Sequence, residues 1–96
     1  MSRRNSEAQD GLSLVDPLTL LTILTIIGSG GAEMAELIHV TGTSRATVAR
    51  VLKHARDYFG VHINWTRTEG NHGVYQITDW GLFDGERVMR HKDHNP

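Results

Sequence analysis

The sequence contains no cysteine, which excludes a disulfide framework and any metal site built from thiolates. Its longest apolar run, residues 18–27, is too short to cross a bilayer and is interrupted by threonines. No secretory signal is visible, so we expect a cytoplasmic protein that does not enter a membrane. A chain of 96 residues forms one modest domain, which is too small for a dinucleotide-binding sheet.

Basic residues are few, and they are unevenly distributed. The formal net charge is −1 with the histidines neutral, and this balance by itself disfavours a polyanionic partner. Residues 5–44 contain five acidic side chains and neither lysine nor arginine. Four cations then follow within residues 45–56, and Asp57 is the acid beside them. Such a cluster on one element matters more to a polyanion than the total charge does.

The apolar run is followed by the residues GSGG, a pattern found both in phosphate-binding loops and at helix ends. Asp16 followed by Pro17 favours a helix start before the run. The polar residues of the run recur at every third position: Thr19, Thr22 and Thr25. This spacing places them on one side of a helix but on both faces of a strand. A phosphate loop of the GxGxxG type would also need glycine where Glu33 stands. The sequence therefore predicts a helix that ends at residues 28–31.

The next stretch predicts two more helices and a hairpin. Apolar spacing indicates a second helix over residues 32–41, and Gly42 supplies a turn after it. Ser44 then caps a third helix, which ends at Phe59. Alternating apolar and polar residues over 61–78 indicate a β-hairpin. Helix, helix, turn, helix and hairpin is the order of a winged helix-turn-helix domain.

The predicted fold is therefore mainly α with a small β-hairpin, a three-helix core that carries a wing. A short final helix is expected over residues 85–91. The domain is expected to span residues 16–91, preceded by a disordered arm, 1–15, and followed by a frayed tail, 92–96.

A resemblance sharpens this prediction. The residues TGTSRATVARVL, 41–52, resemble the turn and recognition helix of bacterial and phage helix-turn-helix regulators, with Gly42 in the turn and Ser44 at the helix cap. The residues GVYQITDWG, 73–81, resemble the end of the wing in small winged-helix domains, including the N-terminal domains of DeoR-type regulators. Two residues depart from the small and apolar types usual at their positions: Ile38 and Thr43.

A helical wheel of the third helix separates an inner face from an outer one. With Val48 at the centre of the inner face, cations lie opposite, among short alanines that let a helix approach base edges. Hydroxyl groups at the start of the helix suit phosphate, and a histidine near its end is a weak further contact. The predicted DNA contacts of this helix are Ser44, Arg45, Ala46, Thr47, Ala49, Arg50, Lys53 and His54. The hairpin tip adds contacts to the backbone or minor groove: Arg67, Asn71 and His72. The alternative for both elements is a solvated surface with ordinary arginines.

The resemblance implies sequence-specific binding of double-stranded DNA and regulation of transcription by operator occupancy, as in compact phage or plasmid regulators. The alternative is a protein-interaction winged helix that binds a polymerase subunit or another protein, and the near-neutral charge favours it. No nucleophile–base arrangement is evident, and the six histidines lack metal-ligand spacing. We therefore expect no enzyme activity, no metal, no cofactor and no small-molecule ligand.

The apolar surface of the first helix predicts a homodimer. Seven apolar residues surround most of its circumference, and Leu20 and Ile23 are predicted to face away from its core side. Leaving such side chains in water is unfavourable, so a second copy is expected to cover them together with Phe83. Alternatively, aromatic residues of the same chain cover this surface: Trp65, Trp80 and Phe83.

Overall fold

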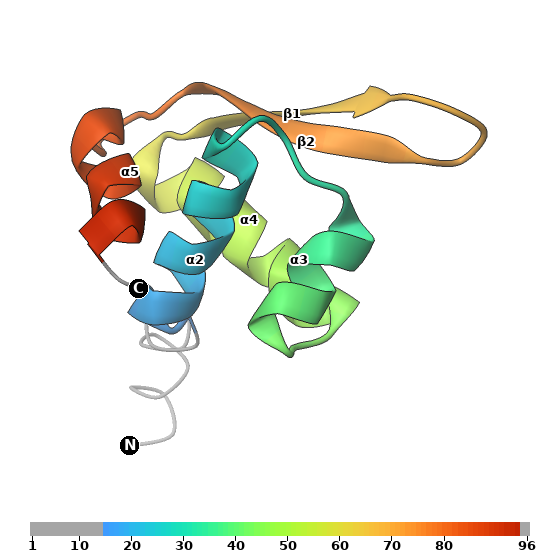
Figure 1. Cartoon of the computed structure of the whole chain (residues 1–96), viewed down its shortest axis with the longest axis horizontal. Coiled ribbons are helices and arrows are strands. Elements are labelled where there is room, and N and C mark those ends of the chain that lie inside the picture. The colour runs from blue at the N-terminus through green and yellow to red at the C-terminus, as the bar shows by residue number, and fades with distance from the viewer. Residues whose placement is uncertain (1–14, 95–96) are drawn as a thin grey trace, which may run out of the picture.

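The computed structural model describes residues 15–94, whose arrangement is shown in Figure 1. In chain order the elements are α2 (Pro17–Gly28), α3 (Met34–Thr41), α4 (Arg45–Phe59), β1 (His62–Arg67), β2 (Gly73–Asp79) and α5 (Gly85–His94). Of the predicted arm, only Val15 is described, and its side chain is buried in the core. The predicted tail is helical as far as His94, because α5 continues beyond its expected end. Residues 1–14 and 95–96 lie outside the described part of the chain.

Helix α2 begins and ends where the sequence predicts. The Asp16 carboxylate accepts hydrogen bonds from the Thr19 amide at 3.2 Å and from the Thr19 hydroxyl at 3.0 Å. Pro17 occupies the first turn, where its missing N–H is not needed. At the other end, the Gly31 amide donates to the Ile27 carbonyl at 2.8 Å. The prediction that the GSGG segment ends a helix is confirmed.

The turn between α3 and α4 depends on Gly42. Its φ of +68° lies in the left-handed region, and its amide closes α3 by donating to the Ile38 carbonyl at 2.9 Å. The Ser44 hydroxyl accepts the Thr47 amide at 3.2 Å and caps α4. Thr43 shares a hydrogen bond of 2.7 Å with the Thr41 hydroxyl, so this departure from the usual apolar residue has a partner.

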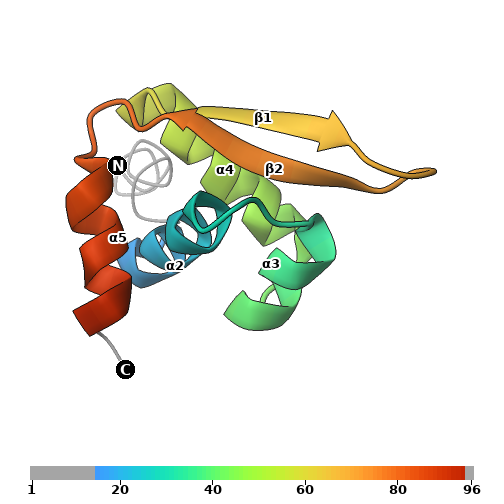
Figure 2. The same cartoon turned by 45° about the horizontal axis from the view of Figure 1, so that its top comes forward.

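The hairpin of β1 and β2 is attached to the helices by a short backbone bridge. The strands pair antiparallel, with Trp65 opposite Tyr75 and Arg67 opposite Gly73. Ala32, in the link between α2 and α3, donates to the Tyr75 carbonyl at 3.1 Å and accepts from the Tyr75 amide at 2.7 Å. Beyond this bridge, the hairpin extends past the helices as a wing, which both views show (Figures 1 and 2).

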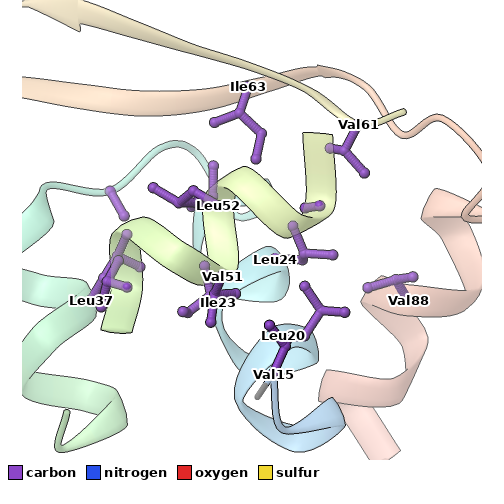
Figure 3. Packing of buried hydrophobic residues seen from close by; sticks show 14 residues of the cluster. Val15, Leu20, Ile23, Leu24, Leu37, Val51, Leu52, Val61, Ile63 and Val88 are labelled. Carbon is purple, nitrogen blue, oxygen red and sulfur yellow. The ribbon is translucent and has the colours of Figure 1, made fainter. Parts of the chain in front are cut away.

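The core is centred on α2, and this corrects one prediction. Leu20 and Ile23, expected to face away from the core, are 7 % and 0 % exposed. Figure 3 shows both among side chains from α4 and α5, such as Val51 and Val88. Helix α2 also contacts α3 and β2, so its apolar arc is covered from several sides within one chain. The argument for a dimer from exposed Leu20 and Ile23 is therefore wrong.

The C-terminal segment supplies much of this cover. Figure 2 shows α5 beside α2, with the chain after β2 leading into it. Trp80 and Phe83 pack against the core, and the Phe83 ring lies 4.7 Å from that of Phe59 between centroids. Trp65 takes no part in covering α2, since it lies on the wing and remains 48 % exposed.

The burial of α2 predicts a contrast between two of its residues. Truncation of Ile23 to alanine is expected to lower the free energy of unfolding by about 2–5 kcal/mol, because it leaves a cavity in a packed core. The matched control is Leu18→Ala at a side chain that is 65 % exposed, where the change should stay within about 0.5 kcal/mol. Urea denaturation followed by circular dichroism measures both. Equal effects at the two positions would contradict this packing of α2.

Candidate nucleic-acid interface

Helix α4 carries an exposed face with two unpaired arginines. Burial along the helix follows the predicted wheel, with the inner side chains Val48, Val51, Leu52 and Ala55 in the core. Ala46, Ala49, Arg50 and Lys53 are exposed on the outer side, and Arg45 is exposed at its start. The guanidinium groups of Arg45 and Arg50 make no hydrogen bond or ion pair to any residue within 15–94. These two cations are therefore free to bind an anionic partner.

His54, the last predicted contact of α4, is largely buried. Its side chain is only 7 % exposed. The imidazole packs 4.6 Å from the Tyr58 ring and 5.8 Å from the Phe59 ring, measured between centroids. His54 lies on the flank of α4 that faces α2 and Phe83. Because neighbouring elements cover that flank, His54 presents little surface to a phosphate.

Two of the clustered cations are engaged inside the molecule. Arg56 donates through Nη2 to the Ile63 carbonyl at 3.1 Å and ties α4 to β1. Lys53 Nζ lies 2.6 Å from Asp57 Oδ2 one turn later in α4. The hydrogen bond to Asp57, together with the attraction between the two charges, raises the pKa of Lys53 above its ordinary value of 10.5. Lys53 remains exposed and charged, but a phosphate would have to compete with Asp57 for it.

The tip of the wing is a tight turn that directs polar groups outwards. Arg67 Nε donates to the Gly70 carbonyl at 2.6 Å, and the Thr68 amide donates to the His72 carbonyl at 2.9 Å. His72 Nδ1 lies 3.7 Å from a carboxylate oxygen of Glu33, which precedes α3. The side chains of Arg67, Asn71 and His72 are all exposed, as a contact with a large partner requires.

Residues predicted to contact DNA line two separate hollows at the surface. A cleft of about 430 Å³ opens between the wing and the N-terminal ends of α3 and α4. It is lined by Glu33, Met34, Ala35, Arg45, Trp65, Asn71, His72, Gly73 and Tyr75. A smaller hollow of about 200 Å³ lies along α4, lined by Arg50, Lys53, His54, Asp57 and Tyr58. The structure thus brings Arg45 together with the wing residues Asn71 and His72, while Arg50 lies with Lys53.

Two residues of the cleft, Trp65 and Glu33, are absent from the predicted DNA contacts. For Trp65 the sequence favours packing in the core or at its rim over a role as a stacking platform, and Glu33 enters the sequence prediction as an obstacle to a phosphate loop. Strand alternation places Trp65 on the same face as Ile63, but the sequence does not show that Ile63 is buried while Trp65 remains half exposed. Glu33 enters the cleft because the Ala32 bridge brings the start of α3 next to β2.

The described residues contain neither a metal-binding cluster nor a membrane-spanning helix. No set of three or more His, Asp or Glu side chains within them is arranged to hold a metal ion. No helix in residues 15–94 has the length and apolarity to cross a bilayer.

The fold is a winged helix-turn-helix: α2, α3 and α4 form the three-helix core, Gly42 the turn, and the hairpin the wing. No protein-family model matches the chain, and a search of curated protein sequences finds no significant relative. A crystal structure of a predicted DNA-binding transcriptional regulator from E. coli is similar in fold, with a TM-score of 0.56 and 19 % sequence identity. The match covers 98 % of each chain, so it includes the wing and the final helix as well as the core.

The pairing of Lys53 with Asp57 can be tested by titration. Asp57→Asn removes the acceptor charge, so the pKa of Lys53 should fall back towards 10.5. NMR measurement of the Lys53 side-chain methylene shifts through the alkaline range reports this value, and Lys53→Arg assigns the signal against that of Lys92, the other lysine. Glu36→Gln on α3 serves as the control and should leave the pKa of Lys53 unchanged. The same pKa with asparagine at position 57 would show that the pair does not form in solution.

Proposed function

We propose that the chain binds double-stranded DNA at a specific sequence and regulates transcription by occupying that site. The observation that carries this proposal is the outer face of α4, where unpaired Arg45 and Arg50 accompany two short alanines beside an extended wing. The similar fold of a predicted DNA-binding regulator supports it at the level of architecture. Because one fold serves many functions, the argument rests chiefly on the arrangement of this face.

In the proposed complex, α4 lies in the major groove. Ala46 and Ala49 let the helix backbone approach the base edges, and Arg50 reaches guanine O6 and N7 with its two-pronged guanidinium. Ser44 and Thr47, at the start of the helix, lie where amides and hydroxyls bind phosphate. Lys53 makes a phosphate contact once Asp57 releases it.

The wing supports this docking from the side. Arg67, Asn71 and His72 contact the sugar–phosphate backbone or the edge of the minor groove. Glu69 and Glu33 lie near these groups and repel phosphate, so the number of backbone contacts is small. A modest dependence of affinity on salt follows, since each phosphate contact adds to the slope.

The proposal includes the finer predictions made from the sequence: a regulator like those of phages or the DeoR-type proteins, acting in the cytoplasm where its DNA is found, without enzyme activity. A homodimer on two half-sites remains part of it, although buried Leu20 and Ile23 no longer support that assembly.

Selection of bound sequences from random duplex DNA at two salt concentrations tests the proposal. An enriched motif, with affinity that falls as salt rises, is the expected result. Two-fold symmetry in the motif would indicate two copies of the chain. The absence of any enriched motif would contradict the proposal and favour the alternative, a winged helix that binds another protein.

Arg50→Ala should weaken binding to the selected duplex by about 1–3 kcal/mol and relax the preference for one base. The physical reason is the loss of a bidentate contact to guanine. Fluorescence anisotropy with the selected duplex and with single-base variants measures both effects. Arg87→Ala, which removes the same charge from α5 away from the wing, is the control and should bind as the unaltered chain does. If Arg50→Ala binds every duplex normally, α4 does not read this DNA.

Arg67→Ala should lower affinity about equally for all sequences. It should also reduce the slope of the log of affinity against the log of salt by about one, because a single phosphate contact is lost. The measurement is a salt series on the selected duplex and on an unrelated one, again with Arg87→Ala beside it. A selective loss on the selected duplex alone would show that the wing, rather than α4, reads the bases.

A further inference from the structure

Trp65 is held in a defined position on the wing although half of it is open to solvent. Its indole lies against the backbone of Gly73, where a Cβ would collide with Cε2 and Cζ2 of the ring and with the Thr66 carbonyl oxygen. Glycine at position 73 is therefore required for the indole to rest there. The indole covers Gly73, which is buried, yet Trp65 itself remains 48 % exposed. The result is an aromatic ring supported by the hairpin with a free surface.

The strand register explains where this free surface lies. Ile63, Trp65 and Arg67 share one face of β1, opposite Ile77, Tyr75 and Gly73 of β2. Ile63 is buried in the core at the base of the hairpin, whereas Trp65 comes two residues later. There the same face no longer meets the helical core, and it becomes a wall of the cleft beside α4.

The other walls of the cleft suit a nucleotide. Arg45 offers an unpaired cation at the start of α4, and Asn71 offers an amide without a hydrogen-bond partner among the described residues. Tyr75 adds a second, half-buried aromatic side chain next to Trp65. The Glu33 carboxylate, which lies 3.7 Å from His72 Nδ1, also lines the cleft and repels phosphate from its own part of it. A phosphate is thus favoured near Arg45, with its sugar or base directed towards the indole.

We propose that Trp65 is a contact platform for one nucleotide of the bound DNA, which lies in the cleft between the wing and the start of α4. This inference rests on the proposed function and adds to it a residue that neither reads the major groove nor pairs with phosphate. The nucleotide presents either the apolar side of its deoxyribose, as in an intact duplex, or the face of an unpaired base. Both are apolar surfaces that an indole binds well, and stacking on an aromatic side chain is sequence-tolerant.

Fluorine NMR tests the contact directly. The chain has two tryptophans, so labelling with 5-fluorotryptophan gives two signals, and Trp65→Phe identifies the one from Trp65. Addition of the selected duplex should shift the Trp65 signal and reduce its response to a paramagnetic quencher in solution. The signal of Trp80, which packs against Gly28 and Gly85, should change much less. Anisotropy of the labelled duplex, recorded on the same samples, shows independently whether DNA is bound.

Affinity measurements add a second readout. Trp65→Leu should weaken binding by about 5- to 100-fold, and Trp65→Phe should retain most of the affinity. Thr66→Ala, on the opposite face of the same strand, is the control and should change binding less than either. Circular dichroism and thermal unfolding confirm that each variant is folded. Should Trp65→Leu fail to fold, the fluorine signal of the unaltered chain still decides the question.

A duplex with one unpaired nucleotide separates the two forms of contact. If the base stacks, the unaltered chain should prefer this duplex and Trp65→Leu should lose the preference. If the sugar makes the contact, both duplexes should bind alike and the variant should weaken both equally. Bound DNA with an unmoved Trp65 signal would overturn this inference while leaving the proposed function standing. No binding of any duplex in the anisotropy measurement would overturn both.

Discussion

Two backbone hydrogen bonds between Ala32 and Tyr75 hold the wing against the helices, and the candidate interface depends on them. A two-stranded hairpin is marginally stable alone, so the added pairing and the burial of Ile63 give it a fixed direction. The same bridge places Glu33 and the start of α3 beside the strands. It thereby forms the cleft in which Arg45 from α4 meets Trp65 and Asn71 from the wing.

The near-neutral charge of the chain is compatible with the proposed function because its cations are unevenly distributed. Arg56 is engaged with the Ile63 carbonyl, and Lys53 with Asp57. Arg45 and Arg50 have no partner within residues 15–94, and they line two different hollows at the surface of one helix. A few unpaired guanidinium groups on an exposed helix suffice for base recognition and do not require a basic protein. In the proposed complex, the small number of such groups makes shape and hydrogen bonds the source of specificity, with little contribution from long-range attraction.

The packing of α2 bears on whether the chain forms a dimer. A helix that is apolar around most of its circumference needs other elements packed against most of it. Helix α5 packs against α2, whose apolar surface the sequence predicts to be buried by a second copy of the chain. The E. coli structure of similar fold matches nearly the whole chain, including this final helix. Helix α5 is thus an integral part of the domain, since its Val88 side chain completes the core around Leu20 and Leu24 (Figure 3).

The sequence by itself determined the elements and their order. Asp16, Ser44 and Gly42 act through hydrogen bonds and dihedral angles within one turn, so their local effects can be read without the rest of the chain. The alternation that predicts the hairpin, and the inner face of α4 around Val48, are likewise local. The tertiary structure alone decided which flanks are covered: it buried Leu20, Ile23 and His54, and it left Trp65 resting on Gly73 above an open cleft. Burial at these positions depends on which distant segments pack against them, and the spacing of residues along one helix or strand does not identify those segments.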